Sequence, residues 1–296
     1  MGKEQENKAS TKKTPKNATK KAPSVVPKDT AKKASDDITP KNLAKEAPSI
    51  VPKKDEKKSK KGLRTFFYIV GILCWTAAAV ILSQIIVGYI MLLIVGKDTF
   101  LQPVPTLIYS ALSYIVAMVA LIFISKRASR RALGLHGSPT WTDIGLAPAG
   151  YLAYLVLAFL FLNIFIMFPW FDANEAQNVG FSVYVFGFDR LVAFITLVII
   201  APIAEEIVFR GWLYGKMRAK LSGVMSNKLS MVISMLLVSL LFGAVHMQWN
   251  VGINVFALSL VLCALREING TIYSGILLHM IKNGIAFYMM FVLCIV

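Results

Sequence analysis

Four long runs without a formal charge constrain this chain more than any other feature. They cover residues 65–96, 99–125, 144–171 and 229–265. A helix needs about 20 apolar residues to cross the hydrocarbon core of a bilayer, and each run is long enough. Backbone polar groups in lipid must be bonded within the segment, which a helix achieves. A transmembrane strand would alternate apolar and polar residues, and these runs do not. The sequence therefore predicts an all-α polytopic membrane protein.

The composition excludes two other classes of protein. Of the 296 residues, 56% are hydrophobic and 16% are charged, whereas about a quarter of a soluble domain is charged. A soluble globular enzyme is therefore not expected. The three cysteines, Cys74, Cys263 and Cys294, all lie in apolar segments and have no metal-type spacing. We interpret them as small buried hydrophobic residues, which excludes a secreted disulfide scaffold.

The amino-terminal segment differs sharply from the rest of the chain. Residues 1–64 hold 19 Lys and Arg, 8 Asp and Glu, six of the twelve prolines and no aromatic residue. Such a segment buries too little apolar surface to fold, so we predict a disordered basic tail, 1–64, before a membrane domain, 65–296. Lys57–Arg64 adjoins the first apolar run, and we expect it to contact anionic lipid headgroups. Nucleic acid is a less suitable partner because the tail lacks stacking aromatics.

We predict about seven transmembrane helices, within a range of six to eight. The segment 251–266 is short for a span, so a re-entrant segment is the alternative there. The predicted spans are residues 65–95, 104–125, 151–169, 190–214, 229–246, 251–266 and 271–294.

Lysine and arginine clusters orient these spans in the membrane. The clusters at 53–64, 126–131 and 216–228 fall on alternate connections, while 172–189 is acidic and aromatic. Basic connections stay in the cytoplasm, so the three basic clusters are predicted inside and 172–189 outside. We therefore expect a multi-pass protein of a bacterial cell membrane with a cytoplasmic amino terminus.

The fourth span carries three ionisable residues at membrane depth, Glu205, Glu206 and Arg210. Each costs about 2.5–3.5 kcal/mol to insert, which makes the cluster a functional candidate. Glu206 and Arg210 are four residues apart and share a helix face, so we expect them to pair. Glu205 is left without that partner, which suits a general base. Pro202 is expected to kink the helix and admit water. A purely structural ion pair is the alternative, but it does not explain Glu205.

Two of the three histidines also lie in predicted spans. His246 follows Phe242 by four residues, and His279 precedes Asn283 by four. With Glu205 they supply a carboxylate, two imidazoles and an amide, which together can bind and activate a water. Glu205, His246 and His279 are also possible ligands of a divalent metal, with zinc the first choice, although no HExxH motif is present. Histidines satisfied within the core are the alternative.

Two features of this set conflict with simple span geometry. At 1.5 Å per residue, Glu205 and His279 reach similar depths, but His246 lies about 26 Å from the inner face. Either the fifth helix enters the membrane later than residue 229, or residues 247–266 are re-entrant, or the set does not meet. Lys282 must reach the interface, face a cavity or pair with a carboxylate.

The three motifs together resemble a known family. Glu205-Glu206-x-x-x-Arg210, Phe242-x-x-x-His246 and His279-x-x-x-Asn283 are similar to the signature of the CPBP family, the CAAX-protease and bacteriocin-processing (Abi) intramembrane proteases. The resemblance covers about residues 126–296. It implies a helical membrane fold with a water-accessible site that hydrolyses peptide bonds. It also implies that Glu205 activates water, that Glu206 and Arg210 support it, and that His246, His279 and Asn283 complete the site, with or without a metal.

The sequence therefore favours an intramembrane endopeptidase of the CPBP type that acts on a membrane-embedded or lipid-associated protein or peptide. Two other functions stay open. One is a non-catalytic membrane scaffold or immunity factor built on a protease fold, because fold does not fix function. The other is a proton-coupled transporter that uses the buried acids and histidines, although the chain shows no inverted repeat.

Overall fold

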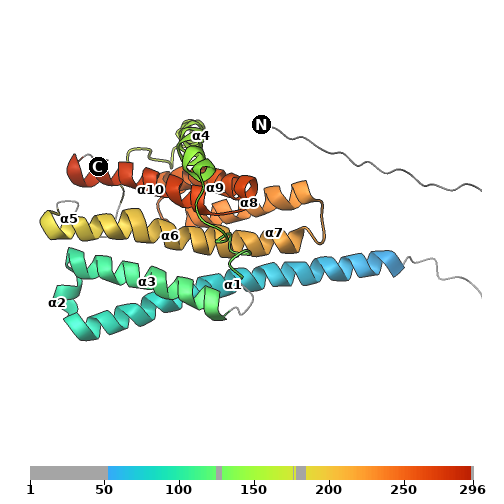
Figure 1. The fold of residues 1–296 in the computed structure, drawn as a ribbon, viewed down its shortest axis with the longest axis horizontal. Coiled ribbons are helices and arrows are strands. Elements are labelled where there is room, and N and C mark those ends of the chain that lie inside the picture. Colours follow the sequence, from blue (N-terminus) through green and yellow to red (C-terminus); the bar gives the residue numbers. More distant parts are fainter. Residues whose placement is uncertain (1–52, 125–128, 176, 178–184, 295–296) are drawn as a thin grey trace, which may run out of the picture. The chain divides into compact units, whose positions relative to one another are not determined.

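The computed structural model describes residues 53–124, 129–175, 177 and 185–294. Within these ranges all regular secondary structure is helical, and seven helical segments are long and apolar enough to span a bilayer (Figure 1). The predicted all-α membrane fold with seven spans is thereby confirmed. Residues 1–52, which hold most of the predicted tail, and Lys126 and Arg127 of the second basic cluster lie outside the described residues.

The helices form a bundle in which short connections join α1 to α3 and the four last spans to one another, whereas residues 125–140 and 166–186 form longer connections on either side of the third span. The fourth span is one continuous rod built of five consecutive helical segments, α5 to α7. In chain order the elements are α1 (Lys53–Val95), α2 (Lys97–Phe100), α3 (Pro103–Ile124), α4 (Trp141–Phe165), α5 (Gly187–Phe194), η1 (Ile195–Ile200), α6 (Ala201–Glu205), η2 (Glu206–Tyr214), α7 (Gly215–Leu221), α8 (Asn227–Ala244), α9 (Trp249–Asn269), α10 (Tyr273–Phe287) and η3 (Tyr288–Val292).

Three of the differences from the predicted spans bear on the fold. Helix α1 begins at Lys53, so the part of the basic segment next to the membrane is helical. Helix α4 begins at Trp141 rather than 151, because Thr140 and Asp143 form a capping box in which each side chain accepts the other's backbone N–H. Helix α9 is a full span of 21 residues, so the re-entrant alternative for 251–266 is wrong.

The fourth span is π-helical on both sides of α6, in η1 and η2. In a π-helix the N–H of residue i donates to the carbonyl of residue i−5. The N–H of residue 202 would therefore be the donor to the Leu197 carbonyl. Pro202 has no N–H, and the Leu197 carbonyl instead accepts a hydrogen bond of 2.9 Å from Asn283 Nδ2 of α10. The disruption expected at Pro202 thus takes the form of a π-helical turn, and a side chain from another span fills the gap in its hydrogen bonding.

The α7–α8 hairpin extends beyond the neighbouring ends of α9 and α10 (Figure 1). Phe242 and His279 have ring centroids only 5.8 Å apart. Phe242 lies about 22 Å along α8 from Asn227, whereas His279 lies about 9 Å along α10 from Tyr273. The start of α8 therefore lies about 13 Å further from the level of the Phe242 ring than the start of α10 does. Of the three explanations for the depth mismatch, a later membrane entry of the fifth helix is the one that the structure supports.

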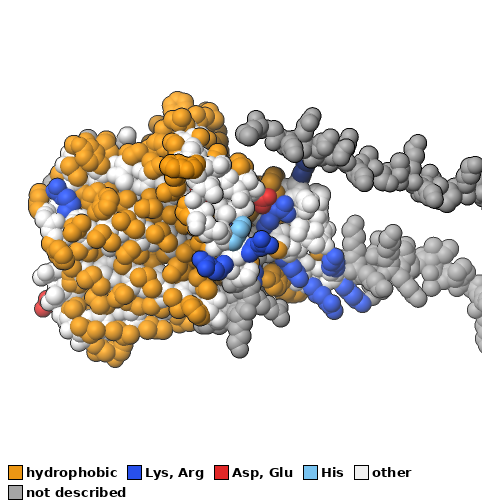
Figure 2. All heavy atoms as spheres, viewed as in Figure 1, with side chains coloured by type: hydrophobic (Ala, Val, Ile, Leu, Met, Phe, Trp, Pro, Cys, Tyr) orange, Lys and Arg blue, Asp and Glu red, His pale blue; other side chains and the backbone are white. Residues whose placement is uncertain are grey.

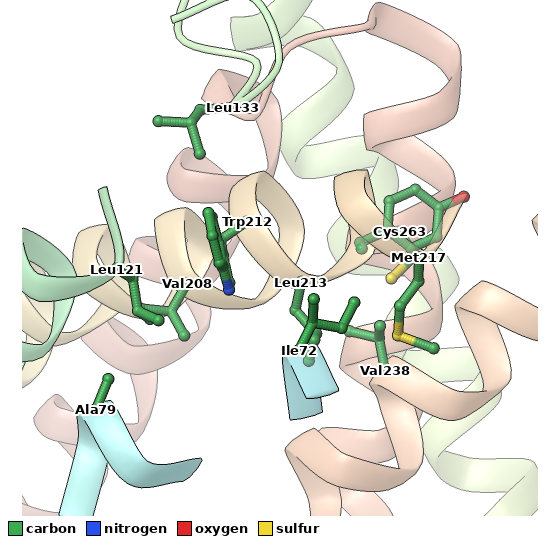
Figure 3. Packing of buried hydrophobic residues seen from close by; sticks show 11 residues of the cluster. Ile72, Ala79, Leu121, Leu133, Val208, Trp212, Leu213, Met217, Val238 and Cys263 are labelled. Atoms are coloured by element: carbon green, nitrogen blue, oxygen red, sulfur yellow. The ribbon is translucent and has the colours of Figure 1, made fainter. Parts of the chain in front are cut away.

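The largest buried cluster lies directly after the acidic pair of the fourth span. Figure 3 shows Trp212, Leu213 and Met217 of this span in contact with residues of α1, α3, α8 and α9. The Trp212 indole N–H also donates to Thr76 Oγ1 of α1 at 3.2 Å. Large apolar side chains cover the outside of the bundle, and Lys and Arg gather at one end (Figure 2). The bundle thus fixes the fourth span at its centre and presents an apolar flank to lipid.

Candidate active site

Glu206 and Arg210 form a buried ion pair within the fourth span. Arg210 Nη1 lies 2.9 Å from Glu206 Oε1, and both side chains are 0% exposed. The Arg210 guanidinium carbon also lies 4.3 Å from the centroid of the Phe242 ring, which gives the cation a second partner. The pairing predicted from the four-residue spacing is therefore present, even though the two residues lie in a π-helical segment.

His279 links both glutamates of the fourth span. Its Nδ1 lies 3.1 Å from Glu206 Oε1, and its Nε2 lies 3.7 Å from Glu205 Oε2. Because the Glu206 carboxylate accepts at Nδ1, that nitrogen carries the proton and Nε2 faces Glu205. The gap of 3.7 Å is too long for a direct hydrogen bond. Gly275, one turn earlier on α10, permits this approach, since a Cβ there would lie 3.1 Å from Glu206 Oε2.

His246 is held near the other site residues by its contacts with Phe242. The Phe242 ring centroid lies 5.2 Å from that of His246 and 5.8 Å from that of His279. His246 Nδ1 lies 2.8 Å from the Phe242 carbonyl oxygen, so Nδ1 donates and Nε2 is the nitrogen left for a ligand. His246 also interacts electrostatically with Glu205. The structure therefore brings together one acid and two imidazoles, with His246 in the turn just after α8 rather than within the span predicted over 229–246, and the alternative that they do not meet is wrong.

Asn283 and Lys282, about one turn after His279 on α10, line a small cavity whose lining does not include Glu205 or either histidine. The cavity has a volume of about 90 Å³, and Leu197 and Phe287 are among its other lining residues. Asn283 Nδ2 donates one of its two hydrogens to the Leu197 carbonyl. Lys282 interacts electrostatically with Glu205, but none of the ion pairs between described residues joins the two. Lys282 thus faces the cavity, which is one of the three positions expected for it.

Tyr114 of α3 is a member of the site that sequence reasoning missed. Its hydroxyl lies close enough to the Glu205 carboxylate for the two groups to interact electrostatically. A tyrosine in an apolar run carries no signal of its own, because the run predicts a helix but not which helix it packs against. Helix α3 packs on α6 and η2, which places this hydroxyl beside the acid.

The predicted metal set receives no support from the geometry. Among the residues that the structure describes, no group of three or more His, Cys, Asp or Glu side chains is arranged to hold a metal ion. Glu205, His246 and His279 lie close together, and Lys282 also interacts electrostatically with Glu205. Zinc ligation by these three residues stays a prediction.

Comparison with known protein families identifies the region that carries these residues. Residues 187–285 match the family described as Type II CAAX prenyl endopeptidase Rce1-like. The chain contains an Rce1-like domain. This domain runs from α5 into α10 and contains all six predicted site residues, which confirms the resemblance to CPBP intramembrane proteases. It covers 99 of the 296 residues, so α1, α3 and α4 lie outside it. No curated protein and no solved structure matches the chain.

Proposed function

We propose that this protein is an intramembrane endopeptidase in which Glu205 activates a water to hydrolyse a peptide bond of a membrane-associated protein or peptide. The Rce1-like domain supports endopeptidase activity in general. The observation that carries the finer proposal is the difference between the two adjacent acids. Glu206 is fully buried and bonded to Arg210, whereas Glu205 is 15% exposed and faces His279 Nε2 without a direct bond. Glu205 is thus the acid that a water can reach.

The bonds and protons of the reaction follow from these positions. Glu205 takes a proton from the water as the water oxygen attacks the carbonyl carbon of the substrate. The tetrahedral intermediate then collapses, the C–N bond breaks, and the proton held by Glu205 passes to the leaving nitrogen. His279, held by Glu206, and His246, held by its own helix backbone, orient the water through their Nε2 atoms. The Glu206–Arg210 pair acts as a positioning pair, because it fixes His279 without touching the substrate.

The negative charge that develops on the carbonyl oxygen needs a donor. Asn283 keeps one amide hydrogen after its bond to Leu197, and that bond fixes the amide on the wall of the cavity. We assign the remaining hydrogen to the oxyanion, with the charge of Lys282 as additional stabilisation. A preorganised donor of this kind is worth about 10²–10³ in rate in other hydrolases.

The first experiment compares wild-type cells with cells that carry Glu205→Gln. The readout is the set of new peptide termini in the membrane proteome and among secreted peptides, with a prenylated CAAX peptide as a defined probe of the purified protein. We expect cleavage products to disappear in Glu205→Gln and to persist in Asp98→Asn, which changes an exposed acid in the short α2. Cleavage that survives in Glu205→Gln would refute the proposed role of this acid.

The same assay separates the remaining functions. A chelator such as 1,10-phenanthroline is expected to leave cleavage unchanged, because the proposed steps use protein groups alone. Loss of cleavage with restoration by zinc would instead support the predicted metal set. A cellular phenotype that survives His246→Ala with His279→Ala would favour the non-catalytic scaffold. Proton-coupled uptake without proteolysis would favour the transporter.

A further inference from the structure

A second, larger cavity opens at the end of the bundle where α7 and α9 finish. It has a volume of about 350 Å³, within the range of small-ligand sites, and shares no lining residue with the Glu205 cluster. Three arginines line it, and the only acidic residue in its lining is Glu267. We call it the arginine pocket and define it by Arg131, Tyr214, Arg218, Ala219, Arg266 and Glu267.

The single acid of the arginine pocket is already satisfied. Glu267 Oε1 accepts hydrogen bonds from the Tyr214 hydroxyl at 2.7 Å and from Arg218 Nε at 3.0 Å. One arginine is therefore neutralised within the pocket, and the charges of Arg131 and Arg266 remain. Lys and Arg are concentrated at this end of the bundle, where the apolar flank stops (Figure 2). The pocket thus has a net positive charge and lies at the level that lipid headgroups occupy.

Two of the three guanidinium groups are held in place by the fold. Arg218 also donates from Nη1 to Ser230 Oγ of α8 at 2.6 Å. Arg266 donates to the Gly270 carbonyl and, at 3.2 Å, to the Ala132 carbonyl, which ties the end of α9 to the loop before α4. These bonds tie α7 to α8 and α9, and the end of α9 to the loop before α4, and this structural role alone would explain Arg218 and Arg266. It does not explain Arg131.

Arg131 belongs to neither of the helices that end at the pocket. It lies in the turn before α4, its side chain is exposed, and no bond joins its guanidinium to another described residue. The turn itself is fixed, because the Arg131 carbonyl accepts from Gly134 N at 3.1 Å and the Arg130 carbonyl accepts from Leu135 N at 2.8 Å. Arg131 therefore extends from a fixed backbone to line a pocket that already holds two ordered arginines, and its guanidinium makes no bond to another described residue.

We propose that the arginine pocket binds the phosphate of an anionic phospholipid. Guanidinium groups bond phosphate oxygens in pairs, and basic pockets between membrane helices are sites for acidic headgroups. A free phosphate compound shares this chemistry. A lipid is favoured because apolar side chains are exposed on the helices that build the pocket or bond to it: Ile268, which follows Glu267 in α9, is 68% exposed, and Leu229, which precedes Ser230 in α8, is 50% exposed. The pocket then anchors the α7–α9 end of the Rce1-like domain to one membrane surface.

The test uses the full chain in nanodiscs of neutral phosphatidylcholine with increasing phosphatidylglycerol. Native mass spectrometry counts the phosphatidylglycerol molecules that the released protein retains. Arg131→Gln removes the uncommitted charge, and Arg130→Gln is the matched control, because Arg130 is the exposed neighbour that does not line the pocket. Ala219→Trp fills the pocket without changing any charge. Thermal unfolding in detergent confirms that each variant is folded.

Retention of phosphatidylglycerol is expected to fall about fivefold in Arg131→Gln, as the loss of one basic contact to an acidic headgroup predicts. Ala219→Trp should reduce it as well, while Arg130→Gln should not. An equal fall in both arginine variants would show general surface charge and overturn the proposal. If glycerol phosphate displaces phosphatidylglycerol when the two are present at equal concentration, the pocket binds a free phosphate compound, and the proposal of a lipid ligand is overturned.

Discussion

The buried ion pair of the fourth span allows a quantitative test of the structure. Arg210→Met keeps most of the side-chain volume but removes the charge that lies 2.9 Å from Glu206. The variant also loses the contact of the cation with the Phe242 ring. Breaking a buried pair by removing one partner costs about 3–5 kcal/mol, because an uncompensated charge is left behind. His279 Nδ1, 3.1 Å from Glu206, still donates a hydrogen bond to the carboxylate in this variant, which favours the lower end of the range.

The double variant Glu206→Gln with Arg210→Met distinguishes this mechanism from simple loss of packing. Without the stranded carboxylate, the double variant should be more stable than Arg210→Met alone by about 2 kcal/mol. The assay is unfolding of the full chain in mixed micelles with increasing dodecyl sulfate, followed by tryptophan fluorescence, to which the buried Trp212 contributes. Lys97→Met, at an exposed position, is the control and should stay within about 0.5 kcal/mol of wild type. A double variant less stable than the single one would refute the reasoning.

Three further substitutions test the contacts that build the site. Asn283→Ala should lower the free energy of unfolding by about 1–3 kcal/mol in the same assay, because it leaves the part-buried Leu197 carbonyl without a donor. The loss should be smaller in a Pro202→Ala background, where residue 202 regains a backbone N–H. Equal losses in both backgrounds would argue against the missing hydrogen bond at Pro202. Gly243→Ala should destabilise the chain by about 1–3 kcal/mol, since its Cβ would lie 2.7 Å from a backbone carbonyl of α9, and unchanged stability would contradict that close approach. Tyr114→Phe should lower the cleavage rate while unfolding stays close to wild type, whereas Tyr109→Phe on the same helix should leave both unchanged; matching rates in the two variants would exclude a role for the Tyr114 hydroxyl.

Much of the architecture follows from local sequence patterns. Long uncharged runs predict membrane helices because a backbone in lipid must bond to itself. The four-residue spacing of Glu206 and Arg210 predicted an ion pair that the structure contains. Boundaries were less predictable: α4 begins ten residues before the predicted position, since the capping pair Thr140 and Asp143 overrides the lower hydropathy of its first turns.

The sequence by itself determined that this chain is a helical membrane protein and which spans carry polar groups, because hydropathy and periodicity act within one helix. Only the tertiary structure decided that these groups meet. The displacement of α8 along its axis relative to α10 brings His246 and His279 to the same Phe242 ring, and the packing of α3 places Tyr114 near Glu205. The relative depth of two helices depends on how their side chains interlock, and no single segment encodes that relation.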